Sequence, residues 1–204
     1  MTRGEPDRAQ GLFTEAARLA EAAGNEISAT IARGAIADIL VSRGDLDEAL
    51  RIRREEQLPV YERLGEVRER AVTMGRIAHI LLRKGDVRAA RALHQDRLAI
   101  YRQLADPDGI GATLWGLAQL DLAEQKIDDA VPRIFEAYAI MSKLGRAEGI
   151  AVIGQLVGQI LAANNEPEEA RAVLRRSAEM YRKLGREDDA KEADDLIRRL
   201  DLER

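Results

Sequence analysis

The chain has 204 residues and a formal net charge of −4, with 33% charged and 46% hydrophobic residues, a composition typical of a folded protein that is soluble in water. It contains no cysteine and two histidines, which excludes disulfides, zinc–thiolate sites and cysteine nucleophiles. The acidic balance disfavours a nucleic-acid partner. No apolar run is long enough to span a membrane, and the start lacks a signal peptide's apolar core. We therefore expect no nucleic-acid or membrane partner and a cytoplasmic location.

Apolar residues recur at the spacing of one face of a helix along the whole chain, and good helix formers dominate the composition. Gly44-Asp45 and Gly85-Asp86 fit a helix-ending glycine followed by an N-capping aspartate. Asp45 and Glu48 also have the spacing of a capping box. In chain order, we expect helices over residues 6–23, 26–43, 46–64, 67–84, 87–104, 107–124, 127–144, 147–163, 167–184 and 187–202.

Three series of residues recur with one common period of about 40 residues, which indicates an internal repeat. The series are Ala37, Ala78, Ala118 and Gly158; Ala49, Ala90, Ala130 and Ala170; and Tyr61, Tyr101, Met141 and Tyr181. Each repeat would be a helix, a tight turn and a second helix. We therefore expect a single array over 1–204, with full repeats at 26–64, 67–104, 107–144 and 147–184. An N-terminal half repeat at 6–23 and a C-terminal capping helix at 187–202 would complete it.

This pattern resembles the tetratricopeptide repeat (TPR) family, in a long-helix variant of about 40 residues per repeat. The family's mark is a small residue midway along the first helix and an alanine at a fixed distance on the second, as in Ala37 and Ala49. A side chain larger than a methyl group would push the two crossing helices apart. The resemblance implies an all-α fold, an α-solenoid of stacked antiparallel helix pairs in a right-handed superhelix, with first helices lining a concave face.

The first repeat has an irregular second helix. The step from Ala49 to Tyr61 is one position longer than the equivalent steps of the other repeats, such as Ala90 to Tyr101. Pro59 lies in the same stretch, where it removes a hydrogen bond and clashes with the carbonyl group of Glu55. Because a π-bulge absorbs one extra residue, we predict a bulge or kink near Glu55–Pro59. For Pro132 we expect a milder bend.

The TPR resemblance also implies that a ligand peptide contacts first-helix side chains in the concave groove. The family's groove register falls on Asp38, Val72, Gly75, His79, Leu82, Arg83, Trp115, Gln119, Leu122, Gln155 and Gln159, with Ile31, Gly34, Val41, Ala112, Val152 and Ala162 completing the rows. This groove would lack a dense Lys/Arg cluster for a carboxylate or phosphate.

Several groove residues have two interpretations. Trp115, the only tryptophan, is either a ligand anchor or a side chain that fills space left by Gly75, Gly111 and Gly116. His79 either contacts a ligand or is a surface histidine bonded to a neighbour such as Asp38.

Three other features point to structure rather than to binding. Glycines 34, 75 and 116 inside helices indicate either close helix approach or a groove floor kept open for a ligand backbone. The charged run Arg51–Glu56 is interpreted as a solvated convex face with i,i+4 pairs. His94 is expected to be exposed or on a repeat boundary.

No catalytic, cofactor-binding or metal-binding motif is present, so we expect no enzyme activity, no cofactor and no metal. The sequence favours a protein–protein interaction scaffold that binds a peptide or protein segment in its groove. One alternative is a structural module that self-associates through its terminal half repeats, because residues 6–23 carry an apolar face. Another is a regulatory or sensor TPR domain of a larger bacterial signalling protein.

Overall fold

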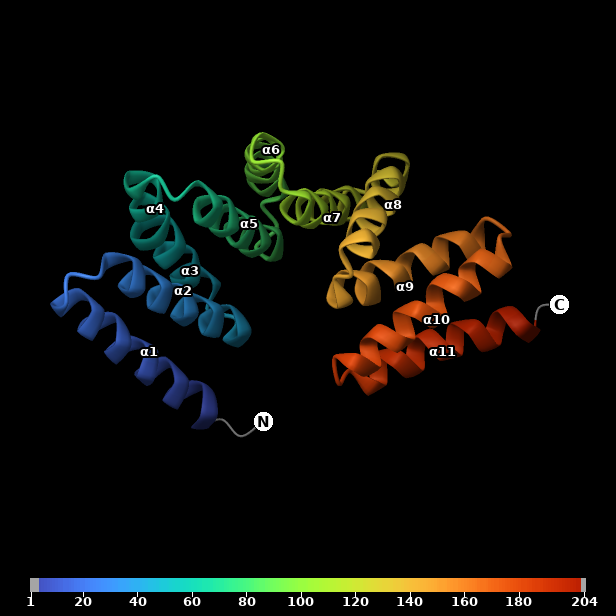
Figure 1. The fold of residues 1–204 in the computed structure, drawn as a ribbon, viewed down its shortest axis with the longest axis horizontal. Helices are drawn as coiled ribbons and strands as arrows, with labels where there is room; N and C mark the ends of the chain where they lie inside the picture. The colour runs from blue at the N-terminus through green and yellow to red at the C-terminus, as the bar shows by residue number, and fades with distance from the viewer. Residues whose placement is uncertain (1–3, 203–204) are drawn as a thin grey trace. The chain divides into compact units, whose positions relative to one another are not determined.

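The structure, a computed structural model, describes residues 4–202, and every regular element in this range is helical (Figure 1). The elements are α1 (Gly4–Ala22), α2 (Glu26–Arg43), α3 (Leu46–Arg51), η1 (Ile52–Gln57), α4 (Leu58–Leu64), α5 (Val67–Arg83), α6 (Val87–Gln103), α7 (Pro107–Ala123), α8 (Ile127–Leu144), α9 (Ala147–Ala163), α10 (Pro167–Lys183) and α11 (Glu187–Leu202). The predicted helix ranges agree with these bounds to within two residues. Among the described helices, none has the combination of length and apolarity needed to cross a membrane.

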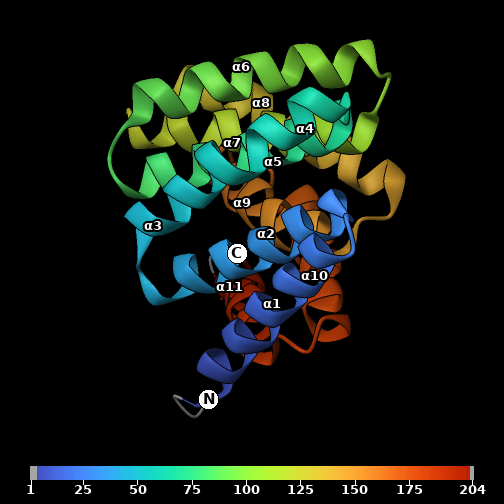
Figure 2. The same cartoon turned by 90° about the vertical axis from the view of Figure 1, so that its left-hand side faces the viewer.

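The chain forms two compact units, and the division falls between Leu104 and Ala105. Unit 1 contains α1 to α6, and unit 2 contains α7 to α11. In both units, consecutive helices joined by tight turns pack against each other as antiparallel pairs (Figures 1 and 2). The expected all-α fold of stacked helix pairs is therefore confirmed within each unit.

Small residues lie where the two helices of each pair cross. The seven alanines of the two crossing series are fully buried: Ala37, Ala49, Ala78, Ala90, Ala118, Ala130 and Ala170. Gly158 is buried too, and a Cβ added to it would lie 2.5 Å from Cγ of Leu174. The predicted steric reason for the repeated small residues is thus confirmed.

The turns follow the predicted glycines for the most part. Gly44 ends α2 with a left-handed φ of 91°, and the Asp86 carboxylate caps α6 by accepting a 3.0 Å hydrogen bond from the amide of Ala89. Gln125 takes the equivalent left-handed place, with φ 60°. The predicted capping box at Asp45 is wrong: the Asp45 side chain accepts no capping hydrogen bond, and the Glu48 carboxylate pairs with Arg51.

The irregular second helix of the first repeat contains a π-helix. Regular α3 gives way to η1 over Ile52–Gln57, and α4 begins directly afterwards with Pro59 in its first turn. At this position proline loses no intrahelical hydrogen bond of α4. The predicted bulge is confirmed, although it begins three residues before Glu55. Pro132 lies inside the continuous helix α8.

Candidate functional site

A cavity of about 520 Å³ in unit 2 lies between the successive first helices α7 and α9. Met141 of α8 forms its floor. We call it the Trp115 pocket; its lining residues are Asp108, Ala112, Trp115, Met141, Arg146, Ala147, Glu148, Gly149, Val152 and Ile153. Three residues of the predicted groove register, Ala112, Trp115 and Val152, therefore share one cavity.

The wall and floor of the Trp115 pocket are mainly apolar, and its rim is charged. Glycine makes room for the floor, since a Cβ added to Gly149 would lie 2.6 Å from Cγ of Met141. At the rim, the Arg146 guanidinium donates two hydrogen bonds to the Asp108 carboxylate, of 2.8 and 3.0 Å. This fork-on-fork ion pair joins the start of α7 to the start of α9.

A smaller cavity of about 210 Å³ lies between the first helices α2 and α5 of unit 1. Its floor comes from η1 and α4. We call it the Arg53 pocket; its lining residues are Ile31, Gly34, Ala35, Asp38, Arg53, Gln57, Tyr61, Glu69, Val72, Thr73 and Arg76.

The two pockets occupy equivalent places in the repeat, two repeats apart, and their floors differ in polarity. The equivalent pairs are Ile31 and Ala112, Gly34 and Trp115, Tyr61 and Met141, Glu69 and Gly149, Val72 and Val152, and Thr73 and Ile153. At three of these places a polar or missing side chain in unit 1 corresponds to an apolar one in unit 2: Gly34 corresponds to Trp115, Thr73 to Ile153, and Tyr61 with its hydroxyl group to Met141.

The floor of the Arg53 pocket is filled by side chains that the π-helix directs at α2. The buried Arg53 guanidinium donates to Oε1 of Gln57 at 2.6 Å, to the Gly34 carbonyl at 3.1 Å and to Asp38. A Cβ added to Gly34 would lie only 2.3 Å from Nε2 of Gln57, so glycine is needed there. Burial lowers the pKa of Arg53, and the Asp38 carboxylate counteracts this shift. Arg76 also donates to Asp38, at 2.7 Å.

These contacts correct the prediction of a solvated face over Arg51–Glu56. Ile52 and Arg53 are buried, whereas Arg54 and Glu55 are exposed as expected. They also give the reason for the helical glycines 34 and 75: polar side chains from the second helix occupy the space beside them. At Gly75, an added Cβ would lie 2.7 Å from Cζ of Arg97.

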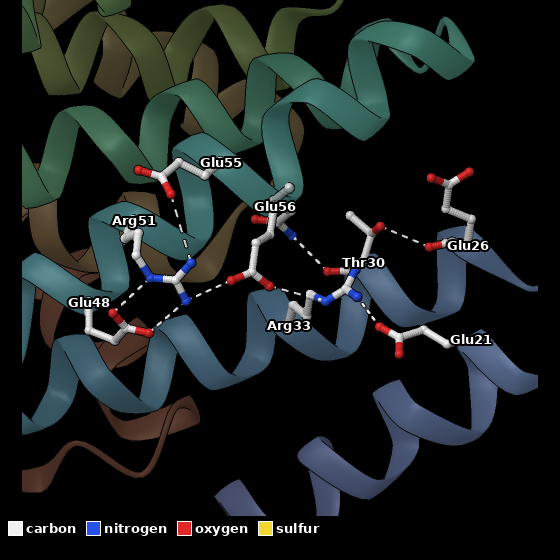
Figure 3. A network of polar contacts seen from close by, with 9 residues as sticks. Glu21, Glu26, Thr30, Arg33, Glu48, Arg51, Glu55 and Glu56 are labelled. Atoms are coloured by element: carbon white, nitrogen blue, oxygen red, sulfur yellow. Dashed lines mark hydrogen bonds and ion pairs between the residues drawn. The ribbon is translucent and has the colours of Figure 1, made fainter.

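A chain of ion pairs connects the exposed side of η1 with its neighbours (Figure 3). Arg51 pairs with both Glu48 and Glu56 at 2.7 Å, and these hydrogen bonds raise the pKa of the Arg51 guanidinium. Arg33 of α2 pairs with Glu56 at 3.2 Å and with Glu21 of α1. These ion pairs therefore link α1, α2 and α3 to the irregular segment η1.

The remaining residues of the predicted groove register are spread over the two units. Gln155 and Gln159 line a cavity of about 280 Å³ against α11. In unit 1, His79 is exposed, and its pKa is lowered because its neighbours remove part of the water around the ring and because Arg83 is close. Arg83 donates to the carbonyl group of Val41 at 2.7 Å. Leu82, Gln119 and Leu122 are partly buried.

The expectation that His94 is exposed is wrong. Its side chain is buried, and its Nδ1 has no hydrogen-bond partner among the described residues. Burial, together with the nearby Arg97 and His79, lowers the pKa of His94 to about 4. No group of three or more potential ligand residues in the described range could hold a metal ion.

Sequence reasoning missed the pocket floors, because Met141, Arg53 and Gln57 lie on second helices. The extra residue before Tyr61 and Pro59 signalled the bulge, but not the direction in which Arg53 and Gln57 point. The stacked helix pairs define an α-solenoid repeat protein, and the Trp115 pocket is a cavity between two of its first helices.

Comparison with known proteins identifies the repeat. The profile of the tetratricopeptide repeat family matches residues 70–111, and solved structures of similar repeat proteins show that the chain has a TPR-like fold. No curated protein matches the sequence.

Similar solved structures establish the fold. BtubC (BKLC) from P. vanneervenii has a TM-score of 0.68 and 15% identity, over 97% of this chain and 91% of that chain. Kinesin light chain TPR-like repeats from Podosopora anserina have a TM-score of 0.58 and 18% identity, over 84% of this chain and 94% of that chain. A Rap protein complexed with Competence and Sporulation Factor has a TM-score of 0.68 and 13% identity, over 98% of this chain and 60% of that chain.

Proposed function

We propose that this protein is a non-catalytic interaction scaffold that binds a peptide or protein segment by taking one of its apolar side chains into the Trp115 pocket. The observation that carries the proposal is the open, mainly apolar cavity of about 520 Å³ beside Trp115. Concave, largely apolar cavities with a few fixed polar groups are typical ligand sites. The similar Rap protein, solved in complex with Competence and Sporulation Factor, supports ligand binding by this fold.

The two pockets differ in how much room they leave for a ligand. In the Arg53 pocket, Arg53, Gln57 and Asp38 bond to one another and to the backbone, and the free volume is less than half as large. In the Trp115 pocket, Met141 occupies the space beside Gly149, and the small side chain of Ala112 leaves the cavity above it open. A large aliphatic or aromatic side chain fits this space, and the Arg146–Asp108 pair at the rim offers donors and acceptors to the main chain of the ligand.

Peptides selected from a displayed random library against the whole chain provide the test. Trp115→Ala removes the wall of the pocket and Ala112→Phe fills it, so each should weaken binding of the selected peptides by about 10-fold or more. Ala123→Phe, at the exposed end of the same helix, is the matched control and should leave affinity unchanged. The groove assignment is wrong if Trp115→Ala and Gln155→Ala both leave peptide binding intact.

A further inference from the structure

Helix α1 lies at the edge of unit 1, where it packs on α2 (Figures 1 and 2). The face toward α2 carries the buried Ala17. Around it, Asp7 and Gln10 each lie 2.7 Å from the guanidinium of Arg43. The contacts of α1 with α2 are therefore those of a second helix with the first helix of the following repeat.

The other face of α1 is apolar and open. Leu12 is 65% exposed, Leu19 54% and Phe13 39%, and Ala16 between them is exposed as well. No other part of unit 1 covers these side chains in the described range. They recur at helical spacing and so form one continuous stripe along the helix.

The repeat register shows that this stripe is the face that a first helix covers in a full repeat. Phe13 takes the place of Ile134 three repeats later, and Ala16 takes that of Ala137. Both Ile134 and Ala137 are fully buried, and Leu174, at the place of Ile134 in the fourth repeat, lies against Gly158 in the first helix of its own repeat. Helix α1 has thus kept the side chains of a covered helix while its cover is missing.

The other terminal helix, α11, does not fit as the cover in a head-to-tail contact between two copies. Where the first helices carry Ala118 or Gly158 at the crossing point, α11 carries Arg198, which is exposed and paired with Asp195. At the place of the fully buried Ala151, it carries the exposed Lys191. Long charged side chains at these positions prevent the close crossing that the other pairs make.

A second α1 fits in sense, size and charge. With the two-fold axis perpendicular to the helices, two copies of α1 run antiparallel, as a second helix and its first helix do in each repeat. With the axis at Ala16, the two small Ala16 side chains meet at the centre of the contact, Leu12 of one copy lies opposite Ala20 of the other, and Phe13 lies opposite Leu19. Glu15 and Arg18, which form a 2.6 Å ion pair beside this face, are also arranged to complement their symmetry mates.

We propose that two copies of this chain associate through an antiparallel α1–α1 contact centred on Ala16. The residues of this contact belong to unit 1 and those of the Trp115 pocket belong to unit 2, so association and peptide binding are tested by separate substitutions. The stripe of Leu12, Phe13 and Leu19 supplies its apolar area.

Sedimentation equilibrium of the full chain over a wide concentration range tests the association. We expect a monomer–dimer equilibrium, and Leu19→Asp should weaken it by about 10-fold or more because the apolar contact is lost. Ile127→Asp is the matched control: Ile127 is 53% exposed, nearly the same fraction as the 54% of Leu19, but it lies on α8. A wild-type chain that stays monomeric at every concentration, or a dimer equally sensitive to both substitutions, would overturn the proposal.

Site-specific crosslinking tests the geometry, since the chain contains no cysteine of its own. Ala16→Cys places two thiols at the two-fold axis, where the Cα atoms come within the roughly 7 Å that a disulfide requires. It should give a covalent dimer under mild oxidation, while Ala172→Cys, on an exposed part of α10, should not. Absence of the Ala16→Cys crosslink, or equal crosslinking of both variants, would show that another surface makes the contact.

Discussion

The crossing point of the fourth repeat offers a test of the steric rule behind the fold. A methyl group added at Gly158 would lie 2.5 Å from Cγ and 2.7 Å from Cδ2 of Leu174, well inside van der Waals contact. Leu174 is fully buried and its branch point cannot swing away as the end of a flexible side chain could. Gly158→Ala should therefore strain the pair of helices α9 and α10.

The size of the effect follows from two opposing contributions. Overpacking of a buried site costs about 1–3 kcal/mol, whereas replacing glycine by alanine inside a helix gains about 1 kcal/mol. We expect Gly158→Ala to lower the free energy of unfolding of unit 2 by about 1 kcal/mol. Adding Leu174→Ile should restore it, because the double variant would then carry the same alanine–isoleucine pair as the fully buried Ala118 and Ile134 of the preceding repeat.

Urea unfolding followed by tryptophan fluorescence gives the required readout, because Trp115 is the only tryptophan and lies on α7 of unit 2. Far-UV circular dichroism in the same titration reports both units together, and coincidence of its transition with the fluorescence transition shows whether the two units unfold in one step. The reasoning is refuted if Gly158→Ala stabilises unit 2 by the full helix-propensity gain, or if Leu174→Ile fails to offset its cost.

Two further predictions concern stability. Gln125 has a left-handed φ of 60°, so Gln125→Gly should raise the free energy of unfolding by about 0.5–1 kcal/mol. Gln95→Gly, on an exposed part of α6, is the control and should lower the free energy of unfolding by about 1 kcal/mol. Equal effects of the two substitutions in urea titrations would argue against the backbone explanation. Burial first, then Arg97 and His79, lowers the pKa of His94 to about 4. The folded state therefore binds a proton on His94 less readily than the unfolded chain does, and the free energy of unfolding of unit 1 should fall by up to about 3 kcal/mol as pH falls from 6.5 to 4. His94→Ile, which introduces the residue found at the equivalent position 134, should make the free energy of unfolding less dependent on pH in urea titrations at pH 7 and pH 5.

The amino-acid sequence alone determined the repeat and its crossing points. Ala37 and Ala49, whose spacing recurs in every repeat, specify where two helices touch, because only hydrogen or methyl fits there. The same counting located the π-helix, since one extra residue between Ala49 and Tyr61 must be absorbed for the next repeat to stay in phase.

Only the tertiary structure decided what lies at the bottom of each pocket. The sequence shows that Gly34 and Trp115 occupy equivalent places, but the partner of each is contributed by a helix many residues away. Gln57 and Arg53 reach Gly34 because the π-helix turns both of them toward α2, and Met141 stays below Trp115 because Gly149 leaves it room. Local spacing dictates helices and turns, whereas the polarity of a cavity depends on side chains that meet only when separate helices pack.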